Sequence, residues 1–131
     1  MNSFLNNAKQ YSPTILRIGI ALVFLWFGTN QIIDPTAWFG FVPDSISTLT
    51  GISIAHLDFI QEVFEIIFGT ALLFGLFTRL VAFLLFLHIL DIAFIVGLDS
   101  LGIRDLGLSV ATFTIFLNGA DRYTLDHFNR N

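Results

Sequence analysis

The fold is decided by residues 57–98, which read LDFIQEVFEIIFGTALLFGLFTRLVAFLLFLHILDIAFIVGL. Apolar residues dominate both sides of a short break at Thr78 and Arg79. The two runs, 57–77 and 80–98, each have about the 20 residues that an α-helix needs to cross the hydrocarbon core of a bilayer. Because so short a connection forces consecutive helices to be antiparallel neighbours, the stretch predicts a membrane-spanning hairpin.

Two further spans are expected on either side of this hairpin, at 14–33 and 101–119. The first ends at Asp34, because the following Pro35 disfavours helical geometry in the residue before it. It contains no small-residue cleavage site, so we interpret it as a retained span and not as a signal peptide. The sequence therefore predicts an all-α integral membrane protein that folds as a four-helix bundle.

The composition agrees with a membrane protein and excludes several functions. Hydrophobic residues make up 55% of the chain and charged residues 12%, whereas soluble domains average about 45–50% and about 25%. Four spans use most of residues 1–131, which are expected to form a single membrane domain. A net charge of −4 with six Lys and Arg provides no basic patch, so no nucleic acid partner is expected. The absence of Cys excludes Cys-ligated iron–sulfur clusters and c-type haem.

The distribution of basic residues predicts the orientation. Cytoplasmic loops of membrane proteins are enriched in Lys and Arg. Four such residues fall on one side of the predicted spans, namely Lys9, Arg79, Arg122 and Arg130. The loop 34–57 contains none, and the last loop contains only Arg104. We therefore expect both termini in the cytoplasm (N-in/C-in) of a multi-pass plasma membrane protein. Trp38 and Phe41 predict that the outer loop lies at the membrane interface or folds over the bundle.

Several polar residues lie inside or at the mouths of the predicted spans, where each is costly and calls for an explanation. They are Asn30, Glu62, Glu65, His88, Asp91, Arg104 and Asp105. With about 1.5 Å of rise per residue, all of them fall in the outer half of the bundle. Glu62 and Glu65 are spaced i, i+3, as are His88 and Asp91, so each pair shares a helix face. The antiparallel hairpin allows these two faces to oppose each other.

Two interpretations of this cluster stay open. It is either a polar pocket in the outer leaflet for a small ligand such as a quinone head group, or a structural network in which the polar groups satisfy one another. In the first case His88 can hydrogen-bond a quinone carbonyl while a neighbouring carboxylate exchanges a proton. No metal site is expected, because di-iron bundles use two Glu-x-x-His motifs that are missing here. No haem is expected, because bis-His ligation of haem b needs two histidines within the spans and only His88 lies in one. Arg17 is expected to reach back to the cytoplasmic interface.

Five short motifs follow one another in a characteristic order and spacing. They are Arg17-Ile-Gly-Ile-Ala-Leu-Val-Phe-Leu-Trp-Phe-Gly28, Asp34-Pro-x-x-Trp38 with Phe41-Val-Pro43, Gly75-Leu-Phe-Thr-Arg79, Arg104-Asp-Leu-Gly-Leu108 and Gly119-Ala-Asp-Arg-Tyr-Thr-Leu-Asp126. Together they resemble the DoxX family of small four-span membrane proteins, over about residues 13–126. A common form of that family has Lys shortly after the position of Gly28, where this chain has Asn30-Gln31.

The resemblance implies a four-helix membrane fold and a choice of functions. DoxX relatives include subunits associated with quinol oxidases and thiosulfate:quinone oxidoreductases, together with cargo receptors and receptor-assembly chaperones. The expected function is a redox-associated subunit whose outer-leaflet pocket binds a quinone or a similar small ligand. The alternative is a non-enzymatic scaffold or chaperone whose polar network is structural. The expected partners are the lipid bilayer, other membrane redox subunits and a second copy of the chain; whether the protein is an enzyme stays open.

Overall fold

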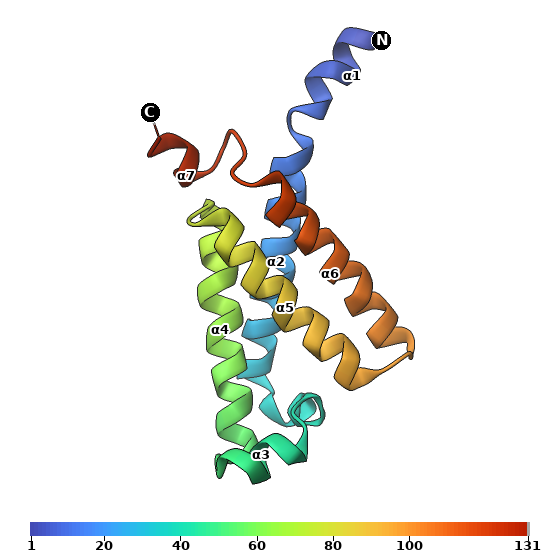
Figure 1. The fold of residues 1–131 in the computed structure, drawn as a ribbon, viewed down its shortest axis with the longest axis vertical. Coiled ribbons are helices and arrows are strands. Elements are labelled where there is room, and N and C mark those ends of the chain that lie inside the picture. Colours follow the sequence, from blue (N-terminus) through green and yellow to red (C-terminus); the bar gives the residue numbers. More distant parts are fainter. Residues whose placement is uncertain (131) are drawn as a thin grey trace.

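The computed structural model describes residues 1–130, and all regular secondary structure in this part of the chain is helical (Figure 1). The elements are α1 (Asn2–Lys9), α2 (Ser12–Ile33), η1 (Pro35–Ala37), η2 (Phe39–Phe41), α3 (Asp44–Thr50), α4 (Ile54–Phe74), α5 (Thr78–Val96), α6 (Ser100–Asn118) and α7 (Leu125–Phe128). The long helices α2, α4, α5 and α6 occupy the four expected segments. Each begins slightly earlier than the sequence predicts.

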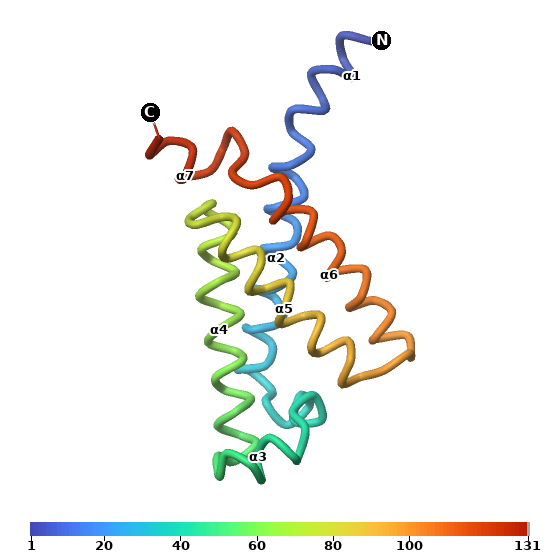
Figure 2. Tube along the Cα trace, viewed as in Figure 1, coloured from blue at the N-terminus to red at the C-terminus, as the bar shows by residue number. Residues whose placement is uncertain are grey.

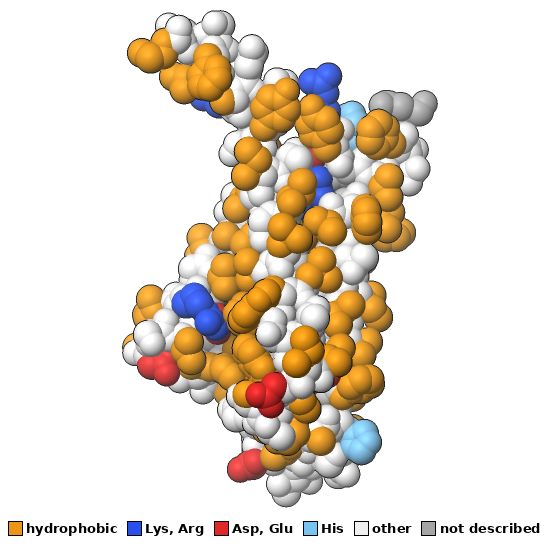
Figure 3. Space-filling view, turned by 180° about the vertical axis from the view of Figure 1, so that it is seen from behind, with side chains coloured by type: hydrophobic (Ala, Val, Ile, Leu, Met, Phe, Trp, Pro, Cys, Tyr) orange, Lys and Arg blue, Asp and Glu red, His pale blue; other side chains and the backbone are white. Residues whose placement is uncertain are grey.

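Three of the long helices, α2, α5 and α6, are long and apolar enough to cross a membrane. The all-α class and the membrane character expected from the sequence are therefore confirmed. Helix α4 has a comparable length but carries Asp58, Glu62 and Glu65, all of which are buried within the protein. On the opposite side of the molecule from the view of Figure 1, hydrophobic side chains are spread over much of the surface between the two ends (Figure 3). Such a surface suits contact with lipid.

The long helices pack as two pairs, α2 with α4 and α5 with α6. Contacts of α2 with α6 and of α4 with α5 join the pairs, which run obliquely to each other (Figure 2). Each long helix contributes to one apolar core, for example through Phe24, Leu72, Leu85 and Ile115. Helices α1 and α7 lie at the end of the molecule that holds the α4–α5 turn, which we call the tail end. The opposite end, with residues 34–53, is called the loop end.

The α4–α5 turn is held by the segment that follows α6, residues 119–128, which we call the tail. Gly75 ends α4 in the left-handed conformation (φ 71°) and accepts a hydrogen bond from the Asp126 N–H (3.0 Å). The Asp126 carboxylate accepts hydrogen bonds from the N–H groups of Phe77 (2.7 Å) and Thr78 (2.6 Å) and from the Thr78 hydroxyl (2.7 Å). The tail therefore supplies the N-terminal cap of α5.

Arg17 in α2 is buried, with 1% of its surface exposed, and pairs with the tail. Its Nε donates to Asp121 Oδ2 (2.6 Å), and its Nη2 donates to the Tyr123 carbonyl (3.2 Å). Its Nη1 donates to the carbonyls of Leu72 (2.9 Å) and Leu73 at the end of α4, which is the negative end of the helix dipole. The expectation that Arg17 reaches the membrane interface is wrong, because these acceptors surround it inside the protein.

The stability of the tail is expected to depend on pH through Asp121 and Asp126. Burial raises the pKa of Asp121, but hydrogen bonds from Arg17, the Tyr123 N–H and Thr14 outweigh this and hold the pKa below its ordinary value of 3.8. Burial likewise raises the pKa of Asp126, and the hydrogen bonds from Thr78 and Phe77 bring it below 3.8. Both carboxylates therefore stabilise the fold fully above the unfolded-state pKa, and this contribution is lost as the pH falls through the lower folded-state values.

We expect the melting temperature in detergent to be nearly constant between about pH 7 and about pH 5 and to fall below about pH 4. Differential scanning fluorimetry across this range measures the effect. The variant Asp126→Asn removes one of the two titrating groups and should show a shallower decline at low pH. An identical decline in this variant would assign the pH dependence to other carboxyl groups.

Candidate functional site

A small cavity lies at the loop end, enclosed by the four long helices and the loop that follows α2. We call it the polar cavity; its volume is about 30 Å³, which is room for about two water molecules. Its walls are formed by Phe24, Phe27, Gln31, Trp38, Phe41, Gln61, Glu65, Ile89, Ile92, Arg104 and Asp105. Polar and aromatic side chains that are far apart in the sequence therefore meet around one enclosed space.

Glu65 on α4 lines the cavity and pairs with His88 on α5, which lies behind it and does not line the cavity. His88 Nε2 lies 2.8 Å from Glu65 Oε1, and the side chains are 13% and 3% exposed. The Phe64 ring lies against the His88 ring, with 5.0 Å between centroids. The opposition of the two helix faces that the hairpin predicts is thus present at this pair.

Two buried acceptor atoms in the wall of the cavity lack hydrogen-bond partners within residues 1–130. They are the second carboxylate oxygen of Glu65, Oε2, and the amide oxygen of Gln31, Oε1. A buried polar atom without a partner costs about 1–3 kcal/mol, so such atoms are uncommon and need an explanation. A ligand or water in the cavity that donates hydrogen bonds would satisfy both.

The close approach of α2 to α4 brings Gln31 to the cavity. A Cβ atom on Gly28 would lie 2.8 Å from Ile66 Cγ1 and 3.2 Å from the Glu62 carbonyl oxygen. Only glycine fits so small a space without a shift of the neighbouring helix. Gly28 therefore sets the spacing of the two helices one turn before Gln31.

Arg104 and Asp105, at the start of α6, close one side of the cavity. Arg104 Nε and Nη2 each lie 2.8 Å from Asp105 Oδ1. The Asp105 side chain is 3% exposed, whereas that of Arg104 is 42% exposed. The Arg104 guanidinium also lies over the Phe27 ring, 5.1 Å from its centroid, which is a cation–π arrangement. This pair separates the cavity from the outer surface.

The loop after α2 folds over the end of the bundle, as one of the two sequence-based alternatives predicts. Trp38 packs edge-on against Phe27, with 5.6 Å between centroids, and lies 5.5 Å from the ring of Phe41. Both Trp38 and Phe41 line the cavity. The aromatic residues of the loop therefore form the cover of the site.

Asp58 and Glu62 extend the acidic face of α4 beyond Glu65. The three residues are spaced i, i+4 and i+7, and Asp58 and Glu62 are 1% and 3% exposed. Asp58 Oδ2 has no hydrogen-bond partner within residues 1–130. Sequence reasoning missed Asp58 because it lies at the expected start of the span.

The remaining residues of the sequence-based site lie outside the cavity. Asn30 donates to the Trp26 carbonyl of its own helix (2.7 Å) and does not line the cavity. Asp91 is exposed. The structure brings Glu65, His88, Arg104 and Asp105 together and adds Gln31 and Gln61, which sequence reasoning did not select. Within residues 1–130, no group of three His, Asp or Glu side chains is placed to hold a metal ion.

The comparisons with known proteins agree with the order of motifs in the chain. The DoxX family model matches residues 12–98, which run from the start of α2 to just beyond the end of α5. No match is found among curated proteins or among solved structures. Because the family match covers well over half of the sequence, the chain belongs to the DoxX family.

Proposed function

We propose that this DoxX-family protein is a redox-associated membrane subunit that binds the polar head of a quinone-type ligand at the polar cavity. The observation that supports the proposal is the Glu65–His88 pair beside two buried, unpartnered acceptors, Glu65 Oε2 and Gln31 Oε1. A reduced quinol carries two hydroxyl donors, whereas an oxidised quinone carries two carbonyl acceptors. The free acceptors therefore favour the quinol form as the ligand.

The Glu65–His88 pair suits a proton acceptor for this ligand. A quinol that is oxidised releases two electrons and two protons. A hydroxyl hydrogen-bonded to Glu65 Oε2 is placed to pass one proton to the carboxylate, which can hand it on to His88 on its other oxygen. The second hydroxyl releases its proton to water. The electrons pass to the redox partner with which such a subunit associates. The chain itself then binds the ligand and accepts a proton from it.

Two hollows beside Arg104 offer room for the rest of a lipophilic ligand. One, of about 520 Å³, is lined almost wholly by apolar side chains of α2 and α6, among them Leu22 and Leu108. The other, of about 250 Å³, lies against Trp38 and Phe41. Arg104 lines both hollows and the polar cavity. Ligand pockets usually measure about 300–1,000 Å³, so the polar cavity alone is too small for the ligand. We propose that the half-exposed Arg104 side chain swings aside and thereby joins the two hollows to the polar cavity.

We further propose that α4 is the fourth span and that the molecule is a four-helix bundle with both termini in the cytoplasm of a plasma membrane protein. The acidic residues of α4 all face inward, while its outward face carries the exposed apolar residues Phe59, Ile60, Ile67 and Phe74. Intramembrane charges that point into a bundle are compatible with a span. The loop end then lies at the outer leaflet, as the excess of basic residues at the tail end predicts.

The substitution Glu65→Gln tests the ligand site, because it removes the charge and keeps the shape. Hydrogen bonds to charged groups contribute about 1.5–3 kcal/mol, so we expect quinol affinity to fall by about 10- to 100-fold. Quenching of the tryptophan fluorescence by a short-chain quinol, titrated in detergent, measures the affinity. The melting temperature should change little.

Asp91→Asn is the matched control, since it neutralises an exposed carboxylate on the same helix as His88. This variant should bind the quinol as the unmodified protein does. A loss of thermal stability in Glu65→Gln without a change in affinity would instead support the scaffold interpretation, in which the polar network is structural. If neither quantity changed, Glu65 would serve neither role.

A further inference from the structure

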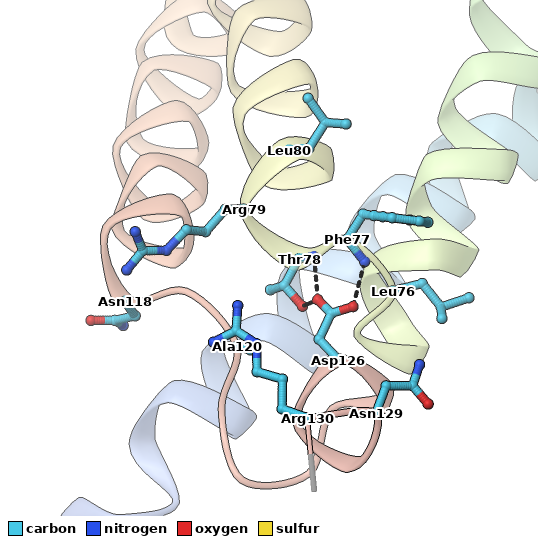
Figure 4. A pocket seen from close by; sticks show the side chains of 10 residues that line it. All are labelled: Leu76, Phe77, Thr78, Arg79, Leu80, Asn118, Ala120, Asp126, Asn129 and Arg130. Carbon is cyan, nitrogen blue, oxygen red and sulfur yellow. Dashed lines mark hydrogen bonds between the residues drawn. The ribbon is translucent and has the colours of Figure 1, made fainter.

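A second hollow, at the tail end, carries positive charge and is independent of the polar cavity. It lies between the α4–α5 turn and the tail and measures about 710 Å³; we call it the basic groove (Figure 4). Arg79, Arg130 and Asn118 lie together on one side of it (Figure 4). The groove is thus lined by two guanidinium groups and a side-chain amide, which are all hydrogen-bond donors.

The packing of Arg79 is specific. A Cβ atom built on Gly119 would lie 2.5 Å from Arg79 Nε and 3.1 Å from Nη2, so the guanidinium lies directly against the bare glycine backbone. Gly119 has φ 75°, a conformation that other residues rarely adopt. The turn that follows α6 is therefore shaped so that Arg79 can lie along it.

The positive charge of the groove is offset only in part within residues 1–130, because the Asp126 carboxylate in its wall lies near Arg130 but not in an ion pair with Arg79. Arg79 has no hydrogen-bond or ion-pair partner among residues 1–130. The acidic residue in the groove wall, Asp126, already accepts three hydrogen bonds from Phe77 and Thr78. The groove consequently offers free donors and a net positive charge to an anion.

The surroundings of the groove select the kind of anion. It lies at the ends of α5 and α6, which are apolar enough to span a membrane, and so at the depth of the lipid head groups. Two apolar residues in its wall, Phe77 and Leu80, are 73% and 58% exposed. A soluble phosphate makes no use of such residues, whereas a phospholipid presents its phosphate to the arginines and its acyl chains to the apolar wall.

We propose that the basic groove binds the head-group phosphate of an anionic phospholipid from the adjoining leaflet. Arg79 and Arg130 contact the phosphate oxygens, for which the planar guanidinium is well suited. Phe77 and Leu80 contact the upper part of the acyl chains. The bound lipid would link the α4–α5 turn to the tail.

Native mass spectrometry of the full chain in detergent tests this assignment. Phosphatidylglycerol and phosphatidylcholine with identical acyl chains are titrated separately, and we expect at least fivefold tighter binding of phosphatidylglycerol. Because a basic residue near an anionic lipid contributes about 1 kcal/mol, Arg79→Gln and Arg130→Gln should each weaken that binding about fivefold. The control Arg122→Gln removes an exposed charge from the same end of the molecule but outside the groove.

Three results would overturn the proposal. They are equal binding of the two lipids, an equal loss in Arg122→Gln, and displacement of the lipid by glycerol 3-phosphate, which would assign the groove to a free phosphate. Because Arg79 packs against Gly119, the variant Arg79→Gln could fail to fold. Arg130 is exposed, so the variant Arg130→Gln decides the question in that case. None of these results bears on quinol binding at the loop end.

Discussion

The substitution Asp121→Ala is expected to destabilise the protein by about 3–5 kcal/mol, which is the usual cost of breaking a buried ion pair by removal of one partner. The variant leaves the Arg17 guanidinium, 1% exposed, without its counter-charge. It also removes the acceptor of the Thr14 hydroxyl and of the Tyr123 N–H. Thermal unfolding in detergent can be monitored by size-exclusion chromatography of heated samples. The melting temperature should be lower by on the order of 10 °C or more.

Two further variants separate the buried charge from other effects of the mutation. Arg122→Ala alters the exposed neighbouring residue and should change the melting temperature by no more than about 1–2 °C. Replacement of both partners, as Arg17→Met with Asp121→Leu, removes the unpaired charge and should recover much of the loss, because apolar pairs often substitute well for buried ion pairs. Equal melting temperatures for Asp121→Ala and Arg122→Ala would mean that Arg17 does not depend on Asp121.

The second large effect is expected for Gly75→Ala. Gly75 has φ 71°, and a Cβ atom there would lie 2.3 Å from Thr124 Cβ and 2.7 Å from Thr124 Cα. The left-handed backbone costs about 1–2 kcal/mol for a residue with a side chain, and overpacking costs about 1–3 kcal/mol more. Because the tail must move away, Asp126 also loses its position as the cap of α5. We expect a loss of about 2–5 kcal/mol in the free energy of unfolding.

Gly51→Ala is the matched control for this prediction. Gly51 ends α3 with the same φ of 71°, but no atom lies within 4 Å of the position of its Cβ. It therefore measures the backbone cost alone, and the difference between the melting temperatures of the two variants reports the contact with the tail. If the two variants had the same melting temperature, the tail would not be tightly packed against the turn.

The part of the site that the sequence predicts depends on local rules. The pairing of Glu65 with His88 follows from helical spacing and from the short connection at Thr78 and Arg79, which fixes α4 beside α5. The i, i+3 spacing predicts the position of Asp91 less well. Residues three apart are separated by about 60° around a helix, and His88 already lies at the edge of the buried face of α5. One step further around the helix, Asp91 is exposed.

The contacts that local rules miss join distant segments. Arg17 and Asp121 are separated by 104 positions, and no spacing or periodicity links α2 to the tail. The polar wall contributed by Gln31 depends on how closely α2 approaches α4 at Gly28, which is a property of the packed pair. A signal existed in the family motifs, however. Three of them, beginning at Arg17, Gly75 and Gly119, meet in one cluster at the tail end.

The position of the tail has a consequence for biosynthesis. Residues 119–128 leave the ribosome after all of the long helices, yet they supply the counter-charge of Arg17 and the cap of α5. Until that moment the newly inserted chain holds an unneutralised guanidinium beside the end of α4 and a hairpin turn without its cap. The tail can therefore dock only after the four long helices have been synthesised. Translation products that stop short of Asp121 cannot complete this docking, and they remain open to the proteases of membrane quality control.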